Sequence, residues 1–247
     1  MVETRTMKKI LLMVLALPVA AVAWGEEAAL PSAPIDTHDA VSIQRGAQVF
    51  VNYCLNCHSA QYMRYNRLLD LGLTEQQVRD NLMFASDKVG NTMTIAMRNA
   101  DAKEWFGVPP PDLSVVARSR GANWLYGYLR SFYRDDQSPT GWNNLLFPNV
   151  GMPNVLWKLQ GQQFLKLAEA GEGHGKHKVE TLALEKPGDL TPHEFDKLVA
   201  DLVNYLVYMG EPARAARVQI GYAVLIALGV LFALVYLLKK EYWKDVH

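Results

Sequence analysis

The pentapeptide Cys54-Leu55-Asn56-Cys57-His58 contains the only two cysteines among the 247 residues, and a histidine directly follows the second one. The pattern C-x-x-C-H is the attachment signature of c-type haem. Each thiol can form a thioether with a vinyl group of the porphyrin, and the adjacent histidine is then held beneath the iron as an axial ligand. The pattern therefore predicts one covalently bound haem c, held by Cys54 and Cys57 and ligated by His58.

Other uses of a cysteine pair fit the sequence less well. A thioredoxin-like C-x-x-C motif occurs beside a βαβ pattern, and no such pattern follows here. A structural zinc site needs about four ligands, and the further candidates, His174 and His177, lie far along the chain in a loop rich in Gly and Lys. A disulfide between residues three apart is possible but strained. Haem attachment is therefore the preferred interpretation.

The first 23 residues have the features of a cleavable signal peptide. A positively charged start is followed by an uncharged apolar run over residues 10–23, which ends in the A-x-A-like cleavage site Ala21-Val22-Ala23. This run is shorter than the roughly 20 residues that span a membrane, which favours cleavage over a retained anchor. Either Met1 or Met7 can be the start. Export agrees with haem attachment, which in bacteria takes place outside the cytoplasm.

A second apolar segment, Val218 to Leu238, is long enough for a transmembrane helix and contains no charged residue. Lysines cluster on the short tail that follows it, which favours a cytoplasmic tail. The sequence thus predicts a periplasmic cytochrome c domain at 24–211, a linker and transmembrane helix at 212–238, and a cytoplasmic tail at 239–247. The chain would lie in the inner (plasma) membrane.

The charges are unevenly distributed although the formal net charge is zero. Residues 24–211 carry 17 Lys and Arg against 22 Asp and Glu. An acidic face suits a basic protein partner through electrostatic steering, or it serves only solubility. The chain has no basic patch, so nucleic-acid binding is not expected.

The secondary structure is predicted to be mostly helical. Apolar spacing predicts a helix from Ile43 that delivers Cys54. Thr74 with Gln77, and Thr191 with Glu194, form capping-box patterns at two helix starts. Residues 86–107 are expected to be irregular, and 171–178 to be a solvated loop. The expected helices are residues 43–54, 74–85, a helix beginning at 123, and 191–210.

A methionine is the expected sixth iron ligand, because His/Met ligation is usual for electron transfer and the thioether raises the potential. Met152 stands out because Gly151 and Pro153 hold it in a defined loop well downstream of His58. A loop methionine is more often only a packing residue. A second histidine or an open position remains the alternative.

Several motifs together resemble the cytochrome c1 family. They are the C-x-x-C-H pentapeptide, Pro110-Pro111-Asp112-Leu113-Ser114 with Arg118 and Arg120, the segment Phe147 to Pro153, and Tyr205 to Pro212 leading into the last helix. The resemblance implies a mostly α, class I cytochrome c-like domain with a single C-terminal transmembrane helix. It also implies that Met152 ligates the iron, that Arg120 pairs with a haem propionate, that Tyr126 hydrogen-bonds a propionate, and that Pro111 and Leu113 line the pocket.

The resemblance further implies an electron-transfer subunit of the bc1 complex with no catalytic chemistry of its own. It would take one electron from a Rieske iron–sulfur protein and pass it to a soluble or membrane-bound cytochrome c, beside cytochrome b in a dimeric complex. The alternatives are a membrane-tethered shuttle or oxidase haem subunit outside a bc1 complex, a haem-based sensor with an open sixth position, and a subunit without haem.

Overall fold

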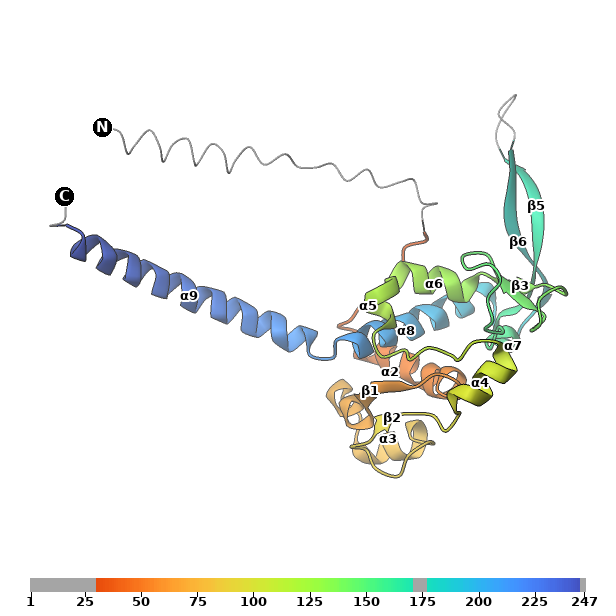
Figure 1. The fold of residues 1–247 in the computed structure, drawn as a ribbon, viewed down its shortest axis with the longest axis horizontal. Helices are drawn as coiled ribbons and strands as arrows, with labels where there is room; N and C mark the ends of the chain where they lie inside the picture. The colour runs from red at the N-terminus through yellow and green to blue at the C-terminus, as the bar shows by residue number, and fades with distance from the viewer. Residues whose placement is uncertain (1–29, 171–176, 245–247) are drawn as a thin grey trace. The chain divides into compact units, whose positions relative to one another are not determined.

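A computed structural model describes residues 30–170 and 177–244, apart from the side chains of 168–170, 177–179 and 215. Within these residues the chain is mainly helical, as predicted, with three two-stranded antiparallel sheets, of which two are short (Figure 1). The predicted signal peptide lies outside the described residues, as do His174 and His247.

Two helices distant in sequence form the centre of the core, α2 (Ala40–Val49) and α8 (Pro192–Gly210). They pack so closely at Gly46 that a Cβ there would overlap the carbonyl oxygen of Asp201 and lie 2.7 Å from Cβ of Tyr205. The rings of Phe50 and Tyr205 meet one turn further along, with centroids 5.3 Å apart. Both helices therefore share one tightly packed interface.

An ion pair with a buried carboxylate reinforces this interface. The carboxylate of Asp201 accepts hydrogen bonds from Arg45 at 2.6 and 2.9 Å and from the Ser42 hydroxyl at 2.6 Å. The Asp201 side chain is only 9% exposed, whereas that of Arg45 is 43% exposed. The carboxylate therefore depends on these partners for the hydrogen bonds that it would otherwise make with water.

Two helices begin where the sequence predicted, at starts whose capping hydrogen bonds join residues only three positions apart. Helix α3 (Glu75–Leu82) and α8 begin with complete capping boxes at Thr74 and Thr191. Helix α2 continues into one π-helical turn, η1 (Phe50–Cys54), so the predicted delivery of Cys54 by a helix is confirmed. The short elements around them are β1 (Ala60–Arg64), η2 (Tyr65–Leu71), β2 (Thr92–Met93), α5 (Val116–Arg120), α6 (Ala122–Arg130), β3 (Phe132–Arg134), β4 (Trp142–Asn144) and α7 (Trp157–Gln160).

Two segments differ from expectation. Part of the stretch expected to be irregular forms helix α4 (Asn99–Phe106), whose first turn is tied by an Arg98–Asp101 ion pair at 2.7 Å. Strands β5 (Gly161–Ala170) and β6 (His177–Pro187) form a long antiparallel hairpin (Figure 1), so the end of the expected 171–178 loop belongs to a strand. Lys166 of β5 and Glu185 of β6 form an exposed ion pair 2.9 Å apart.

The last helix, α9 (Arg214–Tyr242), follows α8 after a link of three residues. Within Ala216–Tyr242, an 18-residue window has a mean hydropathy of 2.5, and none of that window is buried by the rest of the protein. The predicted apolar run 218–238 lies inside this stretch. Among the described residues it is the one helix long and apolar enough to span a membrane, and its exposed apolar surface would be stable in lipid.

Candidate haem-binding site

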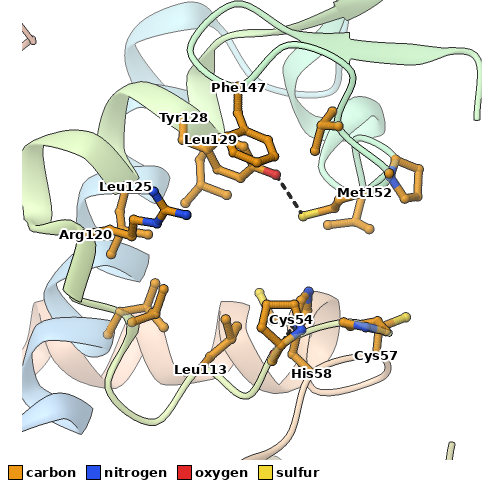
Figure 2. Close-up of a pocket in the computed structure, with 18 of the residues that line it drawn as sticks. Cys54, Cys57, His58, Leu113, Arg120, Leu125, Tyr128, Leu129, Phe147 and Met152 are labelled. Carbon is orange, nitrogen blue, oxygen red and sulfur yellow. Dashed lines mark hydrogen bonds between the residues drawn. The ribbon is translucent and has the colours of Figure 1, made fainter. Parts of the chain in front are cut away.

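A cavity of about 400 Å³ lies between η1, α5, α6, α8, the loop before α5 and the loop that follows β4. Its volume falls in the range of pockets that enclose a small ligand. Figure 2 shows Cys54, Cys57 and His58 along one wall and Met152 on the opposite wall. The cavity thus brings together residues that are almost a hundred positions apart in the sequence.

The imidazole of His58 is oriented by the proline-rich loop. Its Nδ1 lies 2.7 Å from the backbone oxygen of Pro111. Because a carbonyl oxygen only accepts hydrogen bonds, Nδ1 carries the proton and Nε2 keeps a free lone pair for a metal. Burial lowers the pKa of His58, which favours this neutral, ligating form, although the Pro111 carbonyl and Asp112 oppose the shift.

The proline loop is itself anchored to the segment after His58. The backbone N–H of Leu113 donates to the Ser59 oxygen at 2.8 Å. The Asp112 carboxylate accepts from the N–H of Gln61 at 2.9 Å and from that of Ser114 at 2.9 Å. Pro111 and Leu113, which the resemblance places in the haem pocket, both line the cavity. The role of the Pro111 carbonyl in orienting His58 was not predicted, because it depends on a loop 53 residues away.

The two thiols lie on the same wall as His58. The N–H groups of Cys57 and His58 both donate to the Cys54 carbonyl, which forms a tight turn at the end of η1. Burial raises the pKa of Cys54 to about 12, with a smaller contribution from Cys57, and burial also raises the pKa of Cys57. Burial therefore favours the protonated thiol over the thiolate at both residues before haem attachment.

Met152 is positioned by a loop that two asparagines hold in place. Asn144 accepts hydrogen bonds from the N–H groups of Leu146 at 2.9 Å and Phe147 at 3.1 Å. Asn143 accepts from the N–H of Asn149 at 2.8 Å, and Asn149 adopts a positive φ of 61°. The loop therefore has a fixed path toward the cavity, rather than the conformational freedom of an unrestrained surface loop.

No other methionine among the described residues lines the cavity. Met63, Met93 and Met209 belong to the hydrophobic core, where Met93 accepts a hydrogen bond from Tyr205. His193 is exposed at the start of α8. The prediction that Met152 is the sulfur facing His58 is therefore consistent with the geometry.

Sequence reasoning missed Tyr128. Its hydroxyl donates to the Met152 sulfur at 3.4 Å, drawn as a dashed line in Figure 2. Burial raises the pKa of Tyr128 to about 12, so the hydroxyl keeps its proton near neutral pH. Helical spacing could have indicated it, because Trp124, Leu125, Tyr128 and Leu129 fall on one face of α6 and all line the cavity.

Arg120 lines the cavity at the end of α5, and Arg118 does not. The Arg120 guanidinium lies 4.9 Å from the ring centre of Trp124 and 5.9 Å from that of Phe147. These cation–π contacts hold a positive charge at an otherwise apolar site. Arg118 packs its stem near Gly210, where a Cβ would lie 3.3 Å from its Cγ.

Tyr126 is not among the residues that line the cavity. Its ring lies under the guanidinium of Arg130, 4.6 Å from the ring centre, and Arg130 pairs with Asp196 of α8. Two residues along a helix correspond to a rotation of about 200°, which separates Tyr126 from the face that carries Tyr128. The predicted hydrogen bond from Tyr126 to a propionate therefore finds no support in this arrangement.

The residues around the cavity fit a haem. Two thiols can anchor its edge, an imidazole nitrogen and a thioether sulfur face each other across the space, and Arg120 supplies a cation for a propionate. The remaining lining is mainly aliphatic and aromatic, as a planar apolar ring requires. When bound, the group supplies a one-electron iron couple.

Comparison with known proteins gives the same identification. The sequence profile of the Cytochrome C1 family matches residues 31–246. The chain is 51% identical to cytochrome c1 of Allochromatium vinosum and 50% identical to the ammonia monooxygenase gamma subunit of Nitrosomonas europaea, in each case over 98% of this chain and 100% of the relative. It is 30% identical to cytochrome c1 of Rhodospirillum rubrum, over 85% of this chain and 83% of the relative. The chain therefore belongs to the cytochrome c1 family, whose members are membrane-anchored, electron-transfer subunits of bc1 complexes with a covalently bound haem c.

Proposed function

We propose that Cys54 and Cys57 attach the haem, and that His58 and Met152 ligate its iron. The observation that carries this proposal is the pairing of His58 and Met152 across one apolar cavity, with both thiols on the histidine side. Arg120 pairs with a propionate, while Pro111 and Leu113 exclude water from the histidine side. His/Met ligation favours an electron carrier over a sensor, because no coordination position is left open.

The electron enters from a Rieske iron–sulfur protein and leaves to a soluble or membrane-bound cytochrome c. The acidic excess of residues 24–211 supports a partner with a basic docking face, which charge attraction would steer toward the domain. No bond is made or broken in either step. The contribution of this chain is to hold the redox centre at a fixed position, exclude water and set the potential.

The domain at 24–211 lies on the periplasmic side of the plasma membrane after removal of residues 1–23. Helix α9 crosses the membrane and packs on cytochrome b, and the lysine-bearing tail 239–247 lies in the cytoplasm. The assembly is a dimeric bc1 complex. A reporter that works only in the cytoplasm should be active when it is fused to the tail. Activity of a reporter that works only in the periplasm, fused at the same place, would contradict this orientation.

The ligand assignment is tested by near-infrared absorption of the oxidised full-length protein. The weak sulfur-to-iron(III) band is expected in the wild type and is expected to vanish in Met152→Leu, with a fall in reduction potential. Met97→Leu is the matched control, because Met97 is half-buried and outside the cavity. Survival of the band in Met152→Leu would identify another methionine. Absence of the band in the wild type, together with carbon monoxide binding, would favour a sensor.

The partner set is tested by purifying the chain from detergent-solubilised membranes. Cytochrome b and an iron–sulfur protein are expected to accompany it. Purification without cytochrome b would favour a tethered shuttle, or a different assembly such as the one named for the Nitrosomonas relative.

A further inference from the structure

Aromatic neighbours hold the ring of Tyr128 in one position. It stacks on Trp124 with centroids 4.8 Å apart and an angle of 11° between planes. The edge of Phe132 meets it at 5.1 Å and 69°. With both neighbours in place, the phenol has little freedom to turn, and its hydroxyl remains 3.4 Å from the Met152 sulfur.

The backbone that carries Tyr128 is tied to the loop that carries Met152. Asn144 donates through Nδ2 to the Tyr128 carbonyl at 2.8 Å. The Oδ1 atom of the same side chain accepts from the N–H groups of Leu146 and Phe147, at the start of the loop. One buried amide therefore fixes both partners of the hydroxyl–sulfur contact relative to each other.

A thioether sulfur has two lone pairs. When one of them binds iron, the other can accept a hydrogen bond. Such a bond withdraws electron density from the sulfur and makes it a weaker donor. Ferric iron depends on this donation more than ferrous iron does, so a weaker donor disfavours the oxidised state and raises the potential.

We propose that the Tyr128 hydroxyl raises the reduction potential of this cytochrome by hydrogen-bonding the sulfur of Met152. This inference rests on the proposed ligation by Met152. It assigns Tyr128 a positioning and tuning role through the ligand, without direct contact with the iron. The established family role requires only an electron carrier and does not specify this residue.

The test is redox titration and near-infrared absorption of full-length Tyr128→Phe. The substitution removes one oxygen and keeps the ring that packs against Trp124 and Phe132. The near-infrared band should remain, and the potential should fall. A shift of up to about tenfold in the ratio of oxidised to reduced protein is expected, which is about 59 mV for a one-electron couple. Tyr133→Phe is the control, since this half-buried tyrosine lies outside the cavity and should leave the potential unchanged.

Each outcome separates this inference from the ligand assignment. A band that is present in both proteins, with equal potentials, would overturn the role of Tyr128 and leave Met152 as the ligand. If the wild type has the band and Tyr128→Phe lacks it, the hydroxyl only holds the methionine in place. This outcome would also overturn the tuning role. Absence of the band from the wild type would remove the ligand assignment itself.

Discussion

Replacement of Gly46 by alanine should separate the two central helices. A Cβ at this position would lie 2.7 Å from both the carbonyl carbon of Asp201 and Cβ of Tyr205, and ordinary contact begins at 3.4 Å. The neighbours must therefore retreat by at least 0.7 Å, and they are backbone or backbone-proximal atoms of a packed helix. Overpacking usually costs about 1–3 kcal/mol, and rigid neighbours favour the upper end. The gain in helix propensity, about 1 kcal/mol, offsets only part.

The net loss is therefore about 2 kcal/mol, a large fraction of the roughly 5–15 kcal/mol that stabilise a folded domain. It can be measured by urea unfolding of the haem-loaded, detergent-solubilised full-length protein, followed by tryptophan fluorescence. Gly90→Ala is the control, because a Cβ there meets no atom within 4 Å. The near-infrared band should also weaken, because α2 leads to Cys54. Wild-type stability in Gly46→Ala would refute the close approach of α2 and α8.

Two further substitutions test electrostatic contacts in the same urea assay. Asp201→Asn should lower the free energy of unfolding by roughly 2 kcal/mol, because the charged hydrogen bonds with Arg45 are lost and the exposure of Arg45 limits the effect. Equal stability of Asp201→Asn and the wild type would show that the ion pair makes no net contribution to the free energy of unfolding. Glu194→Gln should lower the free energy of unfolding at neutral pH but not at acidic pH. Hydrogen bonds from Thr191 lower the Glu194 pKa below its usual 4.5. The contribution is thus present above the unfolded-state pKa and lost as pH falls through the folded-state value. A stability difference between variant and wild type that stays constant as the pH falls through the Glu194 pKa would contradict this explanation.

Features set by local sequence could be predicted. The C-x-x-C-H turn, the capping boxes at Thr74 and Thr191, and the long apolar run before the tail each depend on residues within a few positions of one another. The motifs also led to the correct family and to its haem and electron-transfer role. Physical chemistry acts over short chain distances at these sites, so a single sequence contains enough information.

The β5–β6 hairpin could not be predicted with the same means. Its strands contain Leu, Lys, Ala and Glu, which are better helix formers than strand formers. What makes them strands is their pairing with each other, with a register shift between Gln162 and Gln163. Helix α4 was missed for a related reason, because no side chain caps its start at Arg98. In both segments tertiary contacts or weak local signals decide the structure.

The residues of the cavity also divide into those that local sequence predicts and those that only tertiary contacts bring together. Cys54, Cys57 and His58 follow from a motif, whereas the contact between Tyr128 and Met152 arises only when α6 and its following loop fold together. Tyr126 illustrates the difficulty, because a displacement of two residues along α6 takes a tyrosine from the cavity to Arg130. Resemblance alone does not specify which of two nearby tyrosines faces the ligand.

The three-residue link between α8 and α9 limits how far this redox centre can travel. Leu206 of α8 lines the cavity one turn before α8 ends at Gly210, and α9 begins at Arg214. Three fully extended residues span roughly 11 Å at most. A domain joined to its membrane anchor by so short a link cannot carry electrons over long distances by its own diffusion. Electrons must therefore be carried over long distances by molecules that come to this domain. The rate at which those molecules arrive, rather than a movement of the domain, would set how fast the redox centre is reduced and oxidised.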